Sequence, residues 1–406
     1  MKYSSPVLFL QIALMSLLLI SCSTTKNINY KNSDLISSLK KEFAPDSRVA
    51  VFDIKGTKKG KDIVYTGETT SEEAKIQLLS KTKSYYKGVE NIVDNIKVLP
   101  DKSLGEKTKG IVRLSACNIR SKPKHSSELS TQAILGTPVR ILKQNGSWYY
   151  IQTPDRYLGW VDAEGIAPLN IYDQKAWYNS DKIIFTDVVG FVYSKPDVRS
   201  NTVSDIVEGA ILKLIGESLD KHFWVVGFPD NRVGYISKKS ASKLKKYLSG
   251  KRQYTDSDVI TAAYKLMGIP YLWGGTSSKA MDCSGFTKTV YFMQGILLPR
   301  DASQQVKVGK PIPIDKKFSK LKRGDLLFFG SKRKDGTDRI THVAIYLGDG
   351  KIIHETGDVK VQSLKKGDSD FAEHRLKTLM QARRIIGYGG DYGVKKLIYV
   401  KDYWEE

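Results

Sequence analysis

One cysteine, Cys283, stands where a glycine-rich turn meets the start of a pattern typical of an amphipathic helix. The turn is formed by residues 271–275 (YLWGG), and apolar residues follow the cysteine at roughly helical spacing at Phe286, Val290, Tyr291 and Met293. Because the positive end of a helix dipole stabilises a thiolate, we expect this position to lower the pKa of the Cys283 thiol. The thiolate is the nucleophilic form of cysteine, so the stretch predicts an attacking sulfur at a helix N-terminus.

Two of the five histidines flank a predicted β-hairpin downstream of Cys283. Residues 340–348 alternate in polarity and are rich in β-branched side chains, and an Asp-Gly turn joins them to residues 350–355. We expect His342 to face the sulfur as its base, and His354 to bind the far ring nitrogen of His342. A nucleophile, a base and an orienting group form a catalytic triad. The alternative from spacing alone is a buried cysteine with two ordinary strand histidines.

Residues 254–390 resemble the NlpC-type cell-wall cysteine peptidases, which have a papain-like fold. Five segments match that family in its order, at residues 271–275, 282–286, 298–305, 324–329 and 341–348. The resemblance implies that Cys283 is the catalytic nucleophile, His342 the base and His354 the third polar residue.

The resemblance also implies a reaction. The bond cleaved would join γ-D-glutamate to a diamino acid, such as meso-diaminopimelate, in peptidoglycan stem peptides. No cofactor or metal is expected, because His125, His222 and His374 lack the spacing of a ligand set. Two alternatives from other classes stay open: a non-catalytic peptidoglycan-binding lipoprotein, and a thiol amidase or acyltransferase of the same fold.

The first 22 residues have the pattern of a lipoprotein signal peptide. Lys2 precedes an apolar run over residues 7–20, which is shorter than a typical membrane span. The run leads into residues 19–22 (LISC), which resemble a bacterial lipobox. We therefore expect Cys22 to carry lipid and to anchor the protein to a membrane of the bacterial cell envelope, facing the periplasm or the surface. The alternative is an ordinary cleaved signal with an incidental cysteine.

Charge and cysteine usage limit the partners. The chain has 65 Lys and Arg against 43 Asp and Glu, a formal net charge of +22, which favours a polyanionic partner or surface. No zinc-finger, helix-turn-helix or RNA-binding aromatic signature is present, so no nucleic acid is expected. Anionic lipid and peptidoglycan peptides are the expected partners. The remaining cysteine, Cys117, is expected to be a buried small hydrophobe, without a disulfide.

The chain is longer than one core usually supports, so several domains are expected. Residues 23–33 are polar and predict a tether, and residues 34–103 predict a small mixed α+β region with a capping box at residues 70–73. Residues 107–168 and 186–240 are loose repeats of short strands separated by turns, typical of small barrels. Both resemble bacterial SH3 modules, the second more weakly.

The expected fold class is therefore multidomain. A papain-like α+β catalytic domain is preceded by two small SH3-like β-barrels and a small N-terminal α+β segment. In a subgroup of the NlpC-type enzymes with this order of units, the first SH3 module closes the non-primed side of the cleft and restricts the enzyme to peptides with a free N-terminal alanine.

Five further residues become candidates for substrate binding through this resemblance. Glu128 and Tyr157 of the first module would face the cleft, and Asp282 would bind the substrate ammonium. Ser284 and Ser303 would form hydrogen bonds along the peptide. The alternatives are surface exposure or barrel packing for Glu128 and Tyr157, and N-capping of the helix for Asp282.

Overall fold

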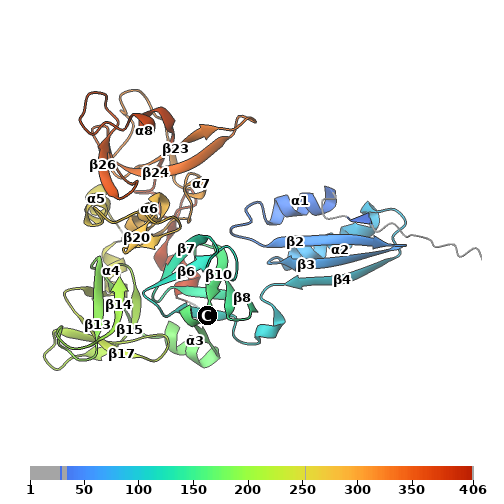
Figure 1. Ribbon diagram of the computed structural model, residues 1–406, viewed down its shortest axis with the longest axis horizontal. Helices are drawn as coiled ribbons and strands as arrows, with labels where there is room; N and C mark the ends of the chain where they lie inside the picture. Colours follow the sequence, from blue (N-terminus) through green and yellow to red (C-terminus); the bar gives the residue numbers. More distant parts are fainter. Residues whose placement is uncertain (1–27, 30–33, 252, 405–406) are drawn as a thin grey trace, which may run out of the picture.

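The computed structural model describes residues 28–29, 34–251 and 253–404 (Figure 1). The predicted signal peptide with Cys22, and most of the predicted tether, lie outside these residues. Within the predicted tether, β1 (Ile28–Asn29) pairs with β2, so this short stretch belongs to a sheet. No helix in the described part of the chain is both long and apolar enough to cross a membrane.

The N-terminal unit is a four-stranded sheet with two helices against its buried face. The strands run in the order β1-β2-β3-β4. Strands β3 and β4 are parallel because helix α2 crosses over between them. Ser71 caps α2, one residue after the predicted capping position, and accepts a hydrogen bond from the Ala74 N–H at 3.1 Å. The elements are α1 (Asp34–Phe43), β2 (Phe52–Lys59), β3 (Asp62–Thr69), α2 (Glu72–Tyr85) and β4 (Asn91–Val98).

A seven-stranded antiparallel sheet follows, in the order β11-β5-β8-β9-β10-β6-β7. Strand pairs in the described residues do not join the first strand of this order to the last. The sheet is therefore open in its hydrogen bonds and not the closed barrel that the strand pattern predicted. Its strands are β5 (Lys109–Val112), β6 (Ala116–Arg120), β7 (Leu129–Ile134), β8 (Pro138–Asn145), β9 (Trp148–Gln152), β10 (Leu158–Asp162) and β11 (Ile166–Leu169).

A second seven-stranded sheet has the order β14-β13-β17-β16-β15-β12-β18 and is open in the same way among the described residues. Helix α3 (Ile171–Tyr178) links the two sheets and α4 (Leu244–Gly250) follows the second. The strands are β12 (Lys182–Phe185), β13 (Val189–Tyr193), β14 (Thr202–Val207), β15 (Ile211–Glu217), β16 (Phe223–Gly227), β17 (Val233–Ser237) and β18 (Ala241–Lys243).

The C-terminal region is a six-stranded antiparallel sheet packed against helices. The buried helix α6 lies between α5 and strands β24 and β25. The strand order is β22-β27-β23-β24-β25-β26. Its helices are α5 (Asp256–Lys265), α6 (Cys283–Phe292), α7 (Ala302–Gln305) and α8 (Glu373–Thr378), and its strands are β22 (Lys310–Ile312), β23 (Leu326–Lys332), β24 (Asp338–Gly348), β25 (Lys351–Glu355), β26 (Val359–Ser363) and β27 (Leu379–Arg384).

Shorter elements complete the chain. Two small ladders pair β19 (Thr276–Ser277) with β20 (Ala280–Met281), and β21 (Ile296–Leu297) with β28 (Lys395–Lys396). The chain beyond residue 390 packs back onto the molecule, where Leu397 and Tyr403 are buried beside Phe292. Single 3-10 turns occur at Lys102–Leu104, Ala163–Gly165, Leu397–Tyr399 and Lys401–Tyr403.

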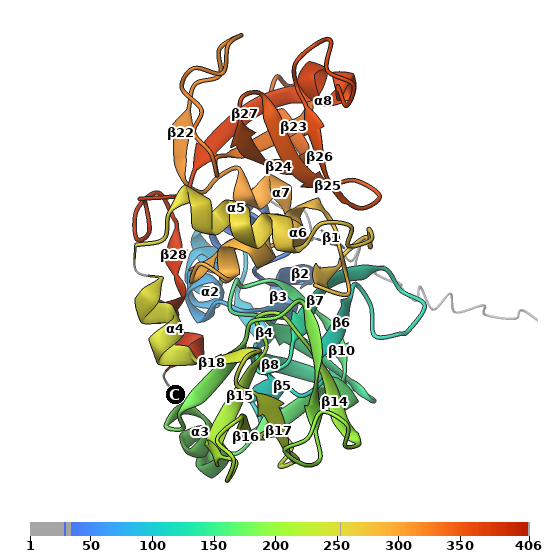
Figure 2. The ribbon, with the colours of Figure 1, turned by 90° about the vertical axis from the view of Figure 1, so that its left-hand side faces the viewer.

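The units meet through apolar contacts. Figure 1 shows the N-terminal unit beside the first sheet, and Figure 2 shows the C-terminal region above both seven-stranded sheets. Leu99, Leu142 and Leu158 form a buried cluster between the N-terminal unit and the first sheet. Burying a leucine side chain stabilises a fold by roughly 1.5–3 kcal/mol, so this cluster holds the two units together.

Candidate active site

Cys283 is the first residue of α6, as the sequence predicted. The turn before it packs tightly on the helix start. A Cβ on Gly285 would lie 2.1 Å from the Gly275 carbonyl oxygen, so only glycine allows this approach. Cys283 is buried, with 8 % of its surface exposed, and lies in the wall of a cleft of about 640 Å³. The glycine-rich turn therefore places the thiol at the edge of a cavity.

The pKa of the Cys283 thiol changes in the direction opposite to the predicted one. Burial and the neighbouring Asp282 carboxylate raise this pKa to about 12. Hydrogen bonds from the backbone of Val343 and Ser284, and the charge of Arg300, lower it but do not outweigh burial. In the free protein Cys283 is thus a neutral thiol, and its proton has to leave as the sulfur attacks.

The two predicted histidines lie side by side on β24 and β25. His342 Nε2 is 2.8 Å from His354 Nδ1, and His354 Nε2 is 2.9 Å from Gln362 Oε1. An amide oxygen only accepts, so His354 carries its proton on Nε2 and accepts at Nδ1 from His342. His342 Nδ1 is then unprotonated. This relay leaves His342, which lies in the wall of the same cleft as Cys283, with one nitrogen free to take a proton.

Burial keeps both histidines neutral. It lowers the pKa of His342 well below the ordinary value, with a further contribution from the positive charge of Arg375. Burial also lowers the pKa of His354, to about 4. At neutral pH the pair therefore carries no charge before substrate binds, which suits a group that accepts a proton.

A β-bulge lies next to His342 in β24. Phe329 pairs with His342 while Gly330 pairs with Ile340, so Thr341 is an extra residue in β24. Bulges of this kind bend a strand and redirect the side chains beside it. The Phe329 ring also packs on the His342 ring, with centroids 5.6 Å apart. The sequence pattern of alternation did not show this bulge.

Gln362 was missed by the sequence analysis. It lies on β26, where Lys360 is opposite His354 and Gln362 is opposite Ile352. Residues two apart on a strand share a face, so Gln362 lies diagonally across from His354. The alternating residues 359–363 predict a strand, but only the register of that strand with β25 places Gln362 near His354.

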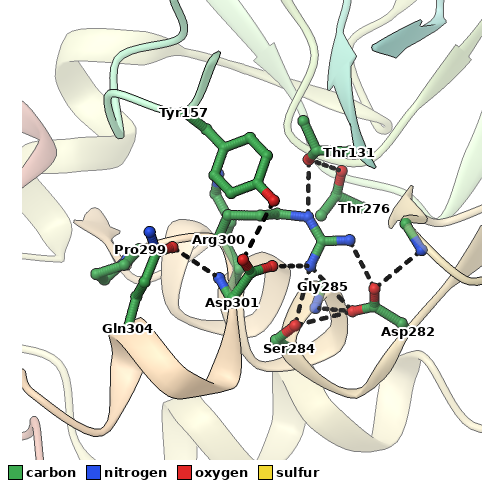
Figure 3. A network of polar contacts seen from close by, with 12 residues as sticks. Thr131, Tyr157, Thr276, Asp282, Ser284, Gly285, Pro299, Arg300, Asp301 and Gln304 are labelled. Atoms are coloured by element: carbon green, nitrogen blue, oxygen red, sulfur yellow. Dashed lines mark hydrogen bonds and ion pairs between the residues drawn. The ribbon is translucent and has the colours of Figure 1, made fainter. Parts of the chain in front are cut away.

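Asp282 and Arg300 form a buried ion pair beside the nucleophile (Figure 3). Arg300 Nη2 is 2.6 Å from Asp282 Oδ2, and Nη1 is 3.1 Å from Oδ1. Arg300 also donates to Ser284 Oγ at 2.9 Å and, from Nε, to Thr131 Oγ1 of the first seven-stranded sheet at 2.7 Å. Arg300 is 1 % exposed, so this network joins two units in the interior.

The carboxylate of Asp282 is fully used within the protein. Its Oδ1 accepts from the Gly285 N–H at 2.8 Å, and its Oδ2 accepts from the Gly274 N–H at 3.1 Å. Burial raises the Asp282 pKa, but the charge and hydrogen bonds of Arg300 outweigh it, so the pKa is lowered. The N-cap interpretation of Asp282 is confirmed. Its contact with a substrate ammonium stays a prediction.

The other candidate residues also lie in the wall of the cleft: Glu128, Tyr157, Ser284 and Ser303. Glu128 accepts from the Trp273 indole N–H at 2.8 Å, and Tyr157 OH donates to Asp301 Oδ2 at 3.1 Å. The first seven-stranded sheet therefore contributes two polar side chains to the cavity that holds Cys283. Tyr271 is in this wall as well, and the sequence analysis gave it no role.

Two family models match the chain. The model of the NlpC/P60 family matches residues 268–378, and the model of the bacterial dipeptidyl-peptidase SH3 domain matches residues 119–166. The chain contains an NlpC/P60 domain and a bacterial SH3 domain. The NlpC/P60 match includes Cys283, His342 and His354, and the SH3 match includes Tyr157.

Curated relatives match more than half of the chain. A γ-D-glutamyl-L-lysine dipeptidyl-peptidase from Bacillus cereus is 29% identical over 238 residues, covering 57% of this chain and 68% of that protein. Dipeptidyl-peptidase 6 from Lysinibacillus sphaericus is 27% identical over 265 residues, covering 63% and 91%. The solved structure of an NlpC/P60 family protein from Bacillus cereus has a TM-score of 0.57 at 23% identity, covers 68% of this chain and 99% of that structure, and shows a shared fold.

The remaining cysteine of the described residues has no role in the NlpC/P60 domain. Cys117 is buried and free, in the core of the first seven-stranded sheet. A Cβ on Gly165 would lie 2.2 Å from its sulfur, so Cys117 fills a tight space. The prediction of a buried small hydrophobe is confirmed.

Replacing His354 with alanine should lower kcat by about 10²-fold, against about 10⁴-fold for His342→Ala, if the NlpC/P60 domain is catalytic. His354 holds His342 in one tautomer and does not touch the sulfur, so KM should change little. Steady-state kinetics on a stem peptide check this, with Gln362→Leu as a milder variant of the same relay. Wild-type kcat in His354→Ala would show that the relay has no role.

Proposed function

We propose that this protein is a cell-wall cysteine peptidase that hydrolyses the bond between γ-D-glutamate and a diamino acid in peptidoglycan stem peptides, with a preference for a free N-terminal L-alanine. The observation that carries the proposal is that Cys283 and His342 line one cleft together with residues of the first SH3 module. Behind His342, His354 and Gln362 continue the hydrogen-bond relay. The name of two relatives, γ-D-glutamyl-L-lysine dipeptidyl-peptidase, supports it.

The chemistry follows from the geometry of the free site. The Cys283 sulfur attacks the peptide carbonyl carbon as its proton passes to His342 Nδ1. N–H groups in the first turn of α6 stabilise the oxyanion. His342 then gives the proton to the leaving amine. Water next attacks the thioester and passes a proton to His342, the C–S bond breaks, and His342 returns that proton to the Cys283 sulfur. His354 accepts from His342 throughout and holds the ring in place.

Carboxylates in the wall of the cleft suit an ammonium group. Asp282 is paired with Arg300 and Asp301 with Arg48, while Glu128 accepts a hydrogen bond from the neutral Trp273 indole. We expect the substrate amine to bind beside Glu128, where the SH3 module would meet a longer chain. This arrangement supports the preference for a free N-terminal residue.

Acetylation of the substrate N-terminus tests that preference. Acetylation removes the charge and adds bulk, so two charge-assisted hydrogen bonds of about 1.5–3 kcal/mol each are lost. We expect kcat/KM to fall by about 10²–10⁴-fold. The assay compares L-Ala-γ-D-Glu-meso-diaminopimelate with its N-acetyl form. Equal rates for the two peptides would contradict recognition of the amine.

Two arginines in the wall of the cleft lack an acidic partner. These are Arg333 and Arg339, and in the described part of the chain no carboxylate pairs with either. Arg375, which interacts electrostatically with Cys283, contacts Thr356 Oγ1 at 3.5 Å and has no carboxylate partner among the described residues. These guanidinium groups favour a leaving amino acid that carries a carboxylate at its side-chain end. We therefore favour meso-diaminopimelate over L-lysine.

Two tripeptides test the choice of diamino acid. L-Ala-γ-D-Glu-meso-diaminopimelate should have a kcat/KM about tenfold above that of the L-lysine peptide, because one charge-assisted contact contributes about 1.4 kcal/mol. Arg339→Gln should reduce this ratio while leaving the L-lysine peptide nearly unchanged. A lysine peptide cleaved as fast as the diaminopimelate peptide would contradict the assignment.

We also propose that the protein is a lipoprotein of the cell envelope, anchored to a membrane through Cys22. The signal-like pattern of residues 1–22 supports this, and it lies outside the described residues. Such an anchor would hold the peptidase close to its wall substrate.

A further inference from the structure

A segment of the N-terminal unit reaches the catalytic cleft. Arg48 lies in the wall of the same cavity as Cys283. Its Nη1 donates to Asp301 Oδ2 at 2.7 Å and to Ser303 Oγ at 2.9 Å, across more than 250 residues of sequence. The N-terminal unit, which had no assigned role, therefore contacts two residues in the wall of the cleft.

Asp46 holds the Arg48 guanidinium from its other side. Nε donates to Asp46 Oδ1 at 2.8 Å and Nη2 donates to Asp46 Oδ2 at 2.7 Å, a bidentate pair. Burial raises the Asp46 pKa, but the hydrogen bonds from Arg48 and Gln304 outweigh it and lower the pKa to about 2. The pair is therefore ionised at neutral pH.

The same segment is tied to the other two units. Gln304 Nε2 of the NlpC/P60 domain donates to Asp46 Oδ2 at 2.8 Å. From the first SH3 module, the Leu158 N–H donates to the Arg48 carbonyl at 2.8 Å, and Gln152 Nε2 donates to the Val49 carbonyl at 2.8 Å. Backbone and side-chain contacts together fix the segment where all three units meet.

We infer that Asp46 and Arg48 are positioning residues of the peptidase, and that the N-terminal unit forms a third wall of its cleft. The inference deepens the proposed function and rests on it. Arg48 occupies an acceptor site of the Ser303 hydroxyl, which leaves the Ser303 O–H to donate to an acceptor oxygen of the peptide. Arg48 also balances the charge of Asp301, which accepts the hydrogen bond of Tyr157.

If Arg48 served domain docking alone, its substitution would have different effects. If Arg48 only held the N-terminal unit in place, its loss would lower stability and leave the kinetics of the folded protein unchanged. If it positions Ser303 and Asp301, its loss weakens substrate binding in folded protein. A measurement of KM therefore distinguishes the two roles.

The experiment compares Arg48→Met with Arg48→Lys in the chain from residue 23 onward. Arg48→Met should raise KM for L-Ala-γ-D-Glu-meso-diaminopimelate by about tenfold with kcat within about threefold, since one or two charge-assisted hydrogen bonds are lost. Arg48→Lys should recover part of the loss because an ammonium still reaches one partner. Lys97→Met is the matched control, because Lys97 lies in the same unit and pairs with Asp101 at 2.9 Å. It should behave as wild type.

A double-mutant cycle with Ser303→Ala tests whether Arg48 acts on the substrate through Ser303. The combined loss should be no larger than the greater single loss, because both variants remove one contact. Additive losses, or an Arg48→Met protein with wild-type KM, would overturn the inference. Binding of the same peptide to the Cys283→Ala protein gives a second readout. There Arg48→Met should weaken affinity by a similar factor even if the wild-type protein cleaves nothing, which separates a failure of this inference from a failure of the proposed function.

Discussion

Cys283→Ala should lower kcat/KM for the stem tripeptide by at least about 10⁴-fold. In the proposed mechanism the sulfur forms the covalent bond, and among the described residues that line the cleft no other side chain is a thiol. The fold should persist, because the substitution removes one buried atom next to a cavity. Chromatographic detection of the released L-Ala-D-Glu measures the loss, and circular dichroism reports the fold.

A serine variant is the matched control for that experiment. Cys283→Ser replaces the thiol with a hydroxyl of similar size, but a hydroxyl attacks far less readily because its pKa is much higher than that of a thiol. It should be nearly as inactive as Cys283→Ala. A near-normal rate of cleavage by Cys283→Ala would contradict the whole mechanism.

Arg300→Met should destabilise the protein by about 3–5 kcal/mol, the range seen when one partner of a buried ion pair is removed. The change leaves the Asp282 carboxylate buried without its cation, and it also breaks the contact with Thr131 of the SH3 module. Urea denaturation of the catalytic region, followed by tryptophan fluorescence, measures the loss.

Two companion variants make the Arg300 experiment specific. Arg300→Lys should recover little stability, because an ammonium does not reproduce the two parallel hydrogen bonds to Asp282. Arg199→Met removes an exposed pair with Asp197 and should have no measurable effect. Equal stability of Arg300→Met and wild type would show that the network does not contribute to the stability of the fold.

Much of the catalytic centre was predictable because its signals are local. The helix start at Cys283 and the hairpin that carries His342 and His354 each depend on residues within one short segment. Alternation and an Asp-Gly turn were sufficient to bring the two histidines onto adjacent strands.

The features that were predicted wrongly or missed depend on contacts between residues far apart in the sequence. The Cys283 pKa was predicted to fall because only the helix dipole was visible, while burial and the Asp282 charge act in the folded protein. The partner of Asp282 is Arg300, which lies inside a matched segment but whose ion pair has no sequence signature. Arg48 contacts Ser303 across 255 residues, a distance that no periodicity spans. The predicted barrels are open sheets, because strand patterns do not determine which edges pair.

The most direct test is incubation of the protein lacking its first 22 residues with L-Ala-γ-D-Glu-meso-diaminopimelate, followed by mass spectrometry of the products. We predict release of L-Ala-D-Glu and free diaminopimelate by the wild type, and no release by Cys283→Ala. Tight binding of the tripeptide by correctly folded wild-type protein without any release would contradict the peptidase and favour a non-catalytic wall-binding protein.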